Sequence, residues 1–277
     1  MAPRRLAFGG LATAALLLSA CSSGDEAGQS SKTLANAAAT RFADRMAGKP
    51  APAPPARPFS VAEKTALLEF AYSYPAQAAA IPAIADKLKR AMARDKADAL
   101  AMAKEDSAAA KQSGFPFHAH SLETHWTVTA DTPRFLALES ENYAFTGGAH
   151  GMTGYATLLW DKARKRETSV DALMTSRAAF AAAIHKRFCA GLDKARAEKR
   201  GAPVVPGDDE FTKCIDPMKE VLAPTSRDGK LIDGITVVIG PYDAGPYAEG
   251  SYEIALPVDR AMYEAIKTEY QDGFARP

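Results

Sequence analysis

Hydrophobic and polar residues alternate in several short stretches of the chain, with the two-residue period of half-buried strands. Between Leu67 and Tyr74 aromatic side chains recur at even spacing until Pro75 ends the run. The turn-forming triplet at 131–133 separates two such stretches and predicts a hairpin. The predicted strands cover residues 67–74, 122–129, 134–145, 152–160, 235–239 and 252–256. Antiparallel pairing is expected, because short turns connect neighbouring strands.

A period near four residues indicates helices. Three apolar residues at this spacing among Lys, Arg and Asp predict an amphipathic helix over 82–113, which Gly114 ends. Ser169 can cap a short helix through Met174, and a longer helix follows. Its apolar stripe consists of Phe180, Ile184, Phe188 and Leu192. A closing helix is expected to begin at Pro257.

These elements predict an α+β fold class. We expect antiparallel sheets, packed by a long helix in the first half of the chain and by two helices in the second. No internal repeat of fixed period is found in the sequence.

The first twenty residues have the pattern of an export signal. Arg4 and Arg5 precede an uncharged apolar run over 6–18, and small residues follow just before Cys21. The run is shorter than the roughly 20 apolar residues that a membrane-spanning helix needs. Residues 1–20 are therefore predicted to be a signal peptide.

The four residues before and including Cys21, Leu-Ser-Ala-Cys, resemble the lipobox of bacterial lipoproteins. The resemblance implies that Cys21 is acylated, with palmitate among the acyl groups, and becomes the first residue of the mature chain. Each buried methylene contributes about 0.8 kcal/mol, so several acyl chains would anchor the protein stably. The alternative is an ordinary secretory signal with a chance cysteine. Ser22 stands where inner-membrane retention usually has Asp, which by resemblance to the Gram-negative sorting rule implies the periplasmic face of the outer membrane.

Residues 21–59 are rich in Ala, Ser, Gly and Pro and end in a proline-rich run. Proline runs favour extended, semi-rigid spacers, and Ser/Gly segments are flexible. This segment is therefore expected to tether the folded part to the membrane.

Composition excludes one class of partner. The chain has 34 Lys and Arg residues against 33 Asp and Glu, a formal net charge of +1. Such a balance gives no general attraction to phosphate backbones, and no basic stripe with interleaved aromatic residues is present in the sequence. Nucleic acid is not expected as a partner.

Two cysteines remain beside Cys21. In an oxidising compartment Cys189 and Cys214 most simply form a disulfide. A loop of about 25 residues closed in this way stabilises a fold by roughly 3 to 4 kcal/mol in the chain-entropy model. The alternative is a reactive Cys189 beside His185, four residues earlier on the same helix face.

Two stretches resemble a known family. Residues 145–151 read Phe-Thr-Gly-Gly-Ala-His-Gly, and residues 241–253 read Pro-Tyr-Asp-Ala-Gly-Pro-Tyr-Ala-Glu-Gly-Ser-Tyr-Glu. Both are similar to the signature stretches of the paired extracytoplasmic domains of PdaC peptidoglycan deacetylases and RsiV anti-sigma factors. The resemblance implies a PdaC-like domain over 60–165 and an RsiV C-terminal-like domain over 166–277.

What the resemblance implies about function is recognition rather than catalysis. In the deacetylases, catalysis belongs to a separate domain with an acidic metal-binding motif, which this sequence lacks. In the anti-sigma factors a cytoplasmic segment holds the sigma factor, and a cleaved signal is expected to leave no such segment here. The extracytoplasmic domains of that family recognise lysozyme, so ligand binding is the property that the resemblance transfers.

The candidate ligand-binding residues come from these two stretches. They are Thr146, Gly147, Gly148, His150, Tyr242, Tyr247 and Tyr252. Glycines permit tight turns or close backbone approach, and tyrosine is enriched at binding hot spots. The alternative is that both stretches are structural loops packed over a sheet.

No metal site, cofactor or catalytic constellation is predicted. His118 and His120 lie two residues apart, on one side of a strand, but His125 falls on the opposite parity and two ligands do not make a site. The sequence contains no His-Glu-x-x-His, Gly-x-Ser-x-Gly or Walker-type pattern.

The leading hypothesis is a non-catalytic envelope lipoprotein that recognises cell-wall glycan (peptidoglycan) or a wall-acting protein such as lysozyme. One alternative is a cell-wall hydrolase that uses carboxylates such as Glu139, Glu141 or Asp243, although no spacing selects them. Another is a structural lipoprotein that supports envelope assembly through protein contacts.

Overall fold

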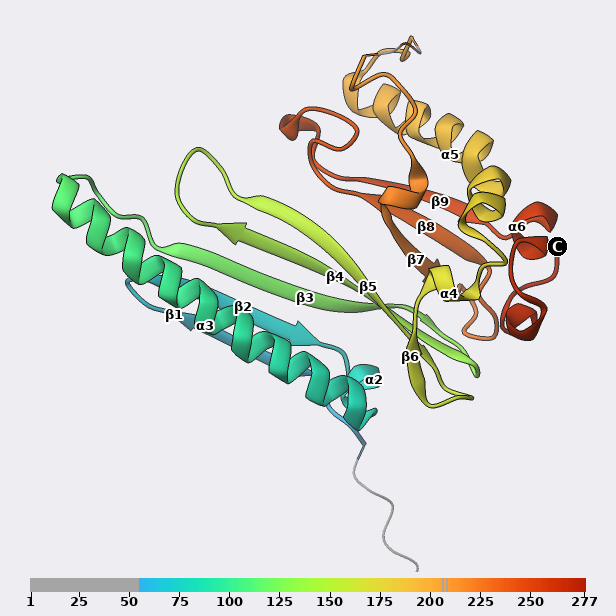
Figure 1. Ribbon diagram of the computed structural model, residues 1–277, viewed down its shortest axis with the longest axis horizontal. Helices are drawn as coiled ribbons and strands as arrows, with labels where there is room; N and C mark the ends of the chain where they lie inside the picture. Colours follow the sequence, from blue (N-terminus) through green and yellow to red (C-terminus); the bar gives the residue numbers. More distant parts are fainter. Residues whose placement is uncertain (1–54, 206, 208) are drawn as a thin grey trace, which may run out of the picture. The chain divides into compact units, whose positions relative to one another are not determined.

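The computed structural model of the chain describes residues 55–205, 207 and 209–277 (Figure 1). The predicted signal peptide, Cys21 and the tether up to residue 54 lie outside the described residues. Residues 55–277 form one unit. Among the helices described, none is long and apolar enough to cross a membrane.

Six strands form the larger sheet, and they lie in chain order (Figure 1). They are β1 (Phe59–Lys64), β2 (Leu68–Tyr74), β3 (His120–Asp131), β4 (Phe135–Phe145), β5 (Met152–Asp161) and β6 (Arg166–Thr168). All neighbours pair antiparallel except β2 and β3, which are parallel. The parallel pair arises because the short helix α2 (Ala76–Ala79) and the long helix α3 (Pro82–Ser113) carry the chain back along the sheet.

Helix α3 covers one face of this sheet. The even-spaced apolar residues of β2, such as Phe70 and Tyr72, are buried against Ile84 and Leu88 of the helix. Gly114 ends α3 in the left-handed conformation with φ 71°, which glycine adopts without steric cost. The helix predicted over 82–113 is confirmed.

A second, antiparallel sheet contains β7 (Val221–Thr225), β8 (Gly234–Ile239) and β9 (Tyr252–Pro257). Helix α5 (Arg177–Arg200) packs on it, and its predicted apolar stripe is fully buried. The shorter elements are α4 (Val170–Leu173), α6 (Arg260–Glu264), η1 (Pro217–Lys219), η2 (Tyr247–Glu249) and η3 (Thr268–Gly273). Ser169 caps α4 through its hydroxyl, as predicted. The closing helix α6 begins at Arg260 rather than Pro257, because Asp259 provides the cap and Pro257 still belongs to β9.

The disulfide between Cys189 and Cys214 is confirmed; it joins α5 to the segment before η1. His185 lies on the same face of α5, with its Nε2 atom 3.6 Å from the sulfur of Cys189. Both sulfurs take part in the disulfide, so the alternative of a reactive Cys189 thiol is not supported.

Strand β4 connects the two halves of the molecule. Leu136 and Leu138 point into the cluster beneath α3, whereas Phe135 and Ala137 belong to the cluster formed with α5 and the second sheet. Strand β7 lies against β3, β4 and β5. Buried residues on both sides of the expected boundary at 165/166 thus pack together. The α+β fold class is confirmed, with antiparallel sheets and the long helix in the first half.

Candidate functional site

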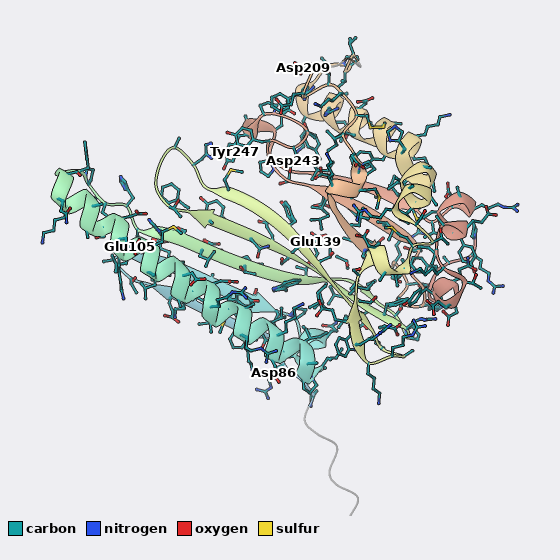
Figure 2. All side chains as sticks on the ribbon, in the orientation of Figure 1. Asp86, Glu105, Glu139, Asp209, Asp243 and Tyr247 are labelled. Carbon is teal, nitrogen blue, oxygen red and sulfur yellow. A yellow bond between two sulfur atoms is a disulfide. The ribbon has the colours of Figure 1, made fainter. Side chains whose placement is uncertain are left out.

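The two stretches that the sequence singled out meet in the structure. The ring of His150, in the loop after β4, stacks on Tyr247 with ring centroids 3.7 Å apart and an angle of 15°. The hydroxyl of Tyr242 lies 3.2 Å from Nε2 of His150. Figure 2 labels Tyr247 on the loop between β8 and β9. We call His150, Tyr242 and Tyr247 the aromatic cluster.

Hydrogen bonds define the proton positions in the aromatic cluster. Nδ1 of His150 lies 2.9 Å from the carbonyl oxygen of Gly151, which can only accept. In the neutral ring we therefore assign the proton to Nδ1. Nε2 is then an acceptor, and the hydroxyl of Tyr242 donates to it.

Tyr242 is held in an unusual backbone conformation. Its φ is 75°, in the left-handed region that non-glycine residues seldom occupy, and its side chain is 45% exposed. Such conformations cost of order 1–3 kcal/mol and persist where the surroundings enforce them, often at binding sites. The fold therefore presents this ring to solvent at an energetic cost.

Helix α5 holds the loop that carries Tyr242 and Tyr247. Arg196 is completely buried and donates from Nε to the carbonyl of Ala244 at 2.9 Å, and from Nη1 to the carbonyl of Lys213 at 3.0 Å. Burial lowers the pKa of its guanidinium. One turn later, Arg200 contacts both carboxylate oxygens of Glu249 at 2.8 and 3.0 Å.

Tyr252 belongs to this support rather than to the exposed surface. It is 2% exposed, and its hydroxyl donates to the carboxylate of Glu249. Burial and the bond to Glu249 raise its pKa to about 12. The amine of Lys199 lies 4.1 Å from its ring centroid. Tyr252 was predicted as a ligand contact, but its surroundings suit it to fixing the loop.

The remaining predicted residues form the tip of the loop between β4 and β5. Thr146 and Gly148 are exposed, and Gly147 and Gly148 have φ values of 99° and 89°. Sequence reasoning overlooked Gly151, where an added Cβ would collide with the ring of Tyr143. Gly151 is the last glycine of the stretch 145–151, but its close approach to Tyr143 depends on the fold.

A cavity of about 290 Å³ lies between β5 and the segments that carry Glu220 and Asp243, and Pro241 and Asp243, the chain neighbours of Tyr242, line it. Burial, followed by the charges of Asp243 and Asp216, raises the pKa of Glu220 to about 7. Burial also raises the pKa of Asp243, partly offset by a hydrogen bond from the backbone of Gly240. One carboxyl of this pair is therefore partly protonated near neutral pH.

Two further carboxylates lie on the face of the larger sheet opposite α3, and a third, Glu253 of β9, acts on one of them. Strand register places Glu139 and Glu141 of β4 on this face, with Tyr155 opposite Glu141. Burial, then the charges of Glu253 and Glu141, raises the pKa of Glu139. The hydroxyl of Tyr155 donates to Oγ of Ser251 at 2.9 Å. Sequence reasoning named Glu139, Glu141 and Asp243 without a spacing to join them, and it missed Glu220 and Glu253.

The histidines considered as metal ligands lie in different surroundings. His120 is buried, with Nε2 3.2 Å from the carboxylate of Asp106, whereas His118 is exposed. Nδ1 of His125 lies 3.0 Å from Oγ of Ser73. In the part of the chain that the structure describes, one group of three ligand-type residues comes together: His185, Cys189 and Cys214. Its two sulfurs are already bonded to each other.

Comparison with known proteins adds information on the first half. The family model described as "Deacetylase PdaC" matches residues 61–153. No curated protein matches the chain. A DUF3298 family structure from Bacteroides fragilis is 19% identical, with a TM-score of 0.48; the match covers 78% of this chain and 94% of that one. A DUF3298 family protein from Pseudomonas aeruginosa PAO1 is 16% identical, with a TM-score of 0.47; the match covers 80% of this chain and 97% of that one.

Residues 61–153 thus carry a PdaC-like domain. It ends just after His150, so the matched region supplies one member of the aromatic cluster. The similarity of 166–277 to the RsiV domain and the lipoprotein character of the chain stay predictions.

Proposed function

We propose that the chain is an extracytoplasmic recognition module, tethered through acylated Cys21, whose aromatic cluster binds cell-wall glycan. The observation that carries the proposal is the junction of two distant loops at His150, Tyr242 and Tyr247. We place the chain on the periplasmic face of the outer membrane because of the export signal, Cys21 and Ser22.

The aromatic cluster has the chemistry that sugar binding needs. An exposed tyrosine offers an apolar ring face at low cost in side-chain entropy, and its hydroxyl can bond to polar groups of a ligand. The carboxylates of Glu220 and Asp243, which line the cavity, can accept hydrogen bonds from the hydroxyl groups of a sugar. A support built on Arg196 and Arg200 holds the loop before binding, which reduces the entropy lost on binding.

A binding experiment with peptidoglycan tests this proposal. The purified chain is incubated with insoluble peptidoglycan, and the bound fraction is compared with that of a Tyr242→Ala, Tyr247→Ala double variant. We expect the double variant to lose at least about tenfold in affinity, since hot-spot tyrosines contribute 2 kcal/mol or more. Phe115→Ala, which removes a 73% exposed ring from another surface, is the matched control and should bind as the wild type does.

The same variants separate glycan from protein recognition. If the chain does not bind peptidoglycan but captures lysozyme, and the double variant loses that capture, the ligand is the wall-acting protein instead. Binding to neither partner, or equal binding by wild type and double variant, contradicts the proposal.

A specific observation favours a second candidate, a cell-wall hydrolase. A carboxyl with a pKa of about 7 beside a second carboxyl suits a general acid at neutral pH. Incubation with muropeptides followed by mass spectrometry tests it. Product formed by the wild type and lost in Glu220→Gln would support hydrolysis, and unchanged muropeptides would remove this candidate.

A further inference from the structure

A pocket of about 580 Å³ lies at the far end of β4 and β5 from the aromatic cluster. Ile81, Leu136 and Trp160 contribute apolar walls, and its polar lining consists of Lys165 and of Lys162 paired with Asp131. The pocket therefore combines an apolar interior with cationic groups, as a site for an amphiphile would.

The turn between β5 and β6 is strongly basic. The five residues from Lys162 to Arg166, the last of which begins β6, include four cations. Lys162 and Arg164 pair with carboxylates. For Lys165 and Arg166, the part of the chain that the structure describes provides no carboxylate at ion-pair distance. Nearby Glu167 pairs with Lys87, and Asp86 of α3 lies toward the same end (Figure 2), so the cations that remain available to a ligand are Lys165 and Arg166.

The described chain begins beside this pocket. Phe59, the first residue of β1, pairs with Tyr74, and their rings stack with centroids 4.8 Å apart. Tyr74 leads through Pro75 into α2, where Gln77 lines the pocket. The described part of the chain therefore begins at this end of the domain (Figure 1).

We propose that this end of the domain docks on the surface of a bilayer that contains anionic phospholipid. Lys165 and Arg166 contact the headgroup phosphates, and the pocket around Trp160 receives the interfacial part of the lipid. Basic residues near an anionic membrane surface each strengthen binding severalfold, and tryptophan is enriched at membrane interfaces. Charge complementarity and the position of the chain's start favour a membrane over a soluble partner.

Docking in this way would direct the aromatic cluster outward. Ten residue pairs of β4 and β5 separate the two ends, from Phe135–Asp161 to Ala144–Met152. At about 3.4 Å per residue this corresponds to roughly 30 Å. The cluster would then face the cell wall while the basic turn faces the lipid.

Vesicle flotation tests the docking surface. The chain from residue 21 onward carries Cys21→Ser, so that neither an acyl anchor nor the apolar run over 6–18 contributes, and is mixed with vesicles of phosphatidylcholine alone or with added phosphatidylglycerol. We expect flotation with the anionic vesicles only, weakened by salt. A Lys165→Asn, Arg166→Gln variant should lose at least about tenfold in affinity. Asn suits position 165 because φ there is 51°.

The control removes two charges elsewhere. Lys186→Gln with Lys194→Gln neutralises two exposed cations of α5 and should leave flotation unchanged. Equal loss in both variants would show a general charge effect and would overturn the proposal. So would the absence of flotation with anionic vesicles.

Fluorescence tests the pocket separately. The chain contains two tryptophans, so Trp126→Phe leaves Trp160 as the single reporter. Anionic vesicles with brominated acyl chains should quench it, because bromine acts only at close range. Flotation without quenching would show that the lipid does not reach Trp160 and would overturn the role of the pocket.

Discussion

At the scale of single residues, surroundings decide what each side chain can do. Tyr242 and Tyr252 come from the same stretch of sequence, yet one is 45% exposed and the other 2%. Glu220 has no distinguishing neighbours in the sequence, yet burial and the charge of Asp243 raise its pKa to about 7. Residue type alone therefore predicts candidates, and the environment selects among them.

Replacing Glu220 with Gln is expected to raise the free energy of unfolding near pH 8 and to leave it almost unchanged near pH 4. The carboxyl has its ordinary pKa of 4.5 when unfolded and about 7 when folded, so between these values the folded state binds more protons. The free energy of unfolding therefore falls as pH rises through this window, and Gln removes that fall.

The difference near pH 8 should be about 1–3 kcal/mol in urea titrations. Glu210→Gln, at an exposed position, is the control and should show no such pH dependence. A Glu220→Gln variant whose stability follows the wild type at both pH values would mean that this carboxyl ionises normally in the folded protein.

At the scale of elements, periodicity predicted what is locally encoded. Helices α3 and α5 each carry an apolar stripe at four-residue spacing, and both formed where expected. Strands β1, β6 and β7 were not predicted. β6 has only three residues, and β7 contains Pro224, which usually argues against a strand. These strands form because they pair with β2, β5 and β8. The residues of one short segment do not reveal which distant strand it pairs with.

Replacing Arg196 with Leu should loosen the loop that carries Tyr242 and Tyr247. The change removes charged hydrogen bonds to the carbonyls of Ala244 and Lys213, each worth about 1.5–3 kcal/mol. Amide hydrogen exchange over residues 241–247 should become at least about tenfold faster. Lys194→Leu, at an exposed position on the same helix, should leave this exchange unchanged; equal rates in both variants would contradict the support assigned to Arg196.

At the scale of the whole molecule, the two sheets depend on each other. Strand β4 places Leu136 and Leu138 beneath α3, and Phe135 and Ala137 against the second half. This arrangement brings the loop after β4 to the loop before β9, where the aromatic cluster forms. The disulfide between Cys189 and Cys214 further ties α5 to the segment that Arg196 contacts.

Removing this disulfide with Cys189→Ser and Cys214→Ser should lower the free energy of unfolding by about 3–4 kcal/mol, because the open chain gains entropy when unfolded. Urea denaturation measures the loss. The chain with Cys21→Ser, which retains the disulfide, should unfold like the wild type. If the double variant had the same urea midpoint as the wild type, the disulfide would not restrict the unfolded chain as predicted.

The sequence by itself determined the α+β class, the extent of α3, the buried stripe of α5, most strands and the disulfide partners. Each of these follows from local periodicity or from a count of cysteines. Only the tertiary structure decided that His150 meets Tyr242 and Tyr247, that Tyr252 is buried and that Glu220 lies beside Asp243. Such contacts depend on strand register and on the packing of segments about 90 residues apart, and local patterns carry no record of either.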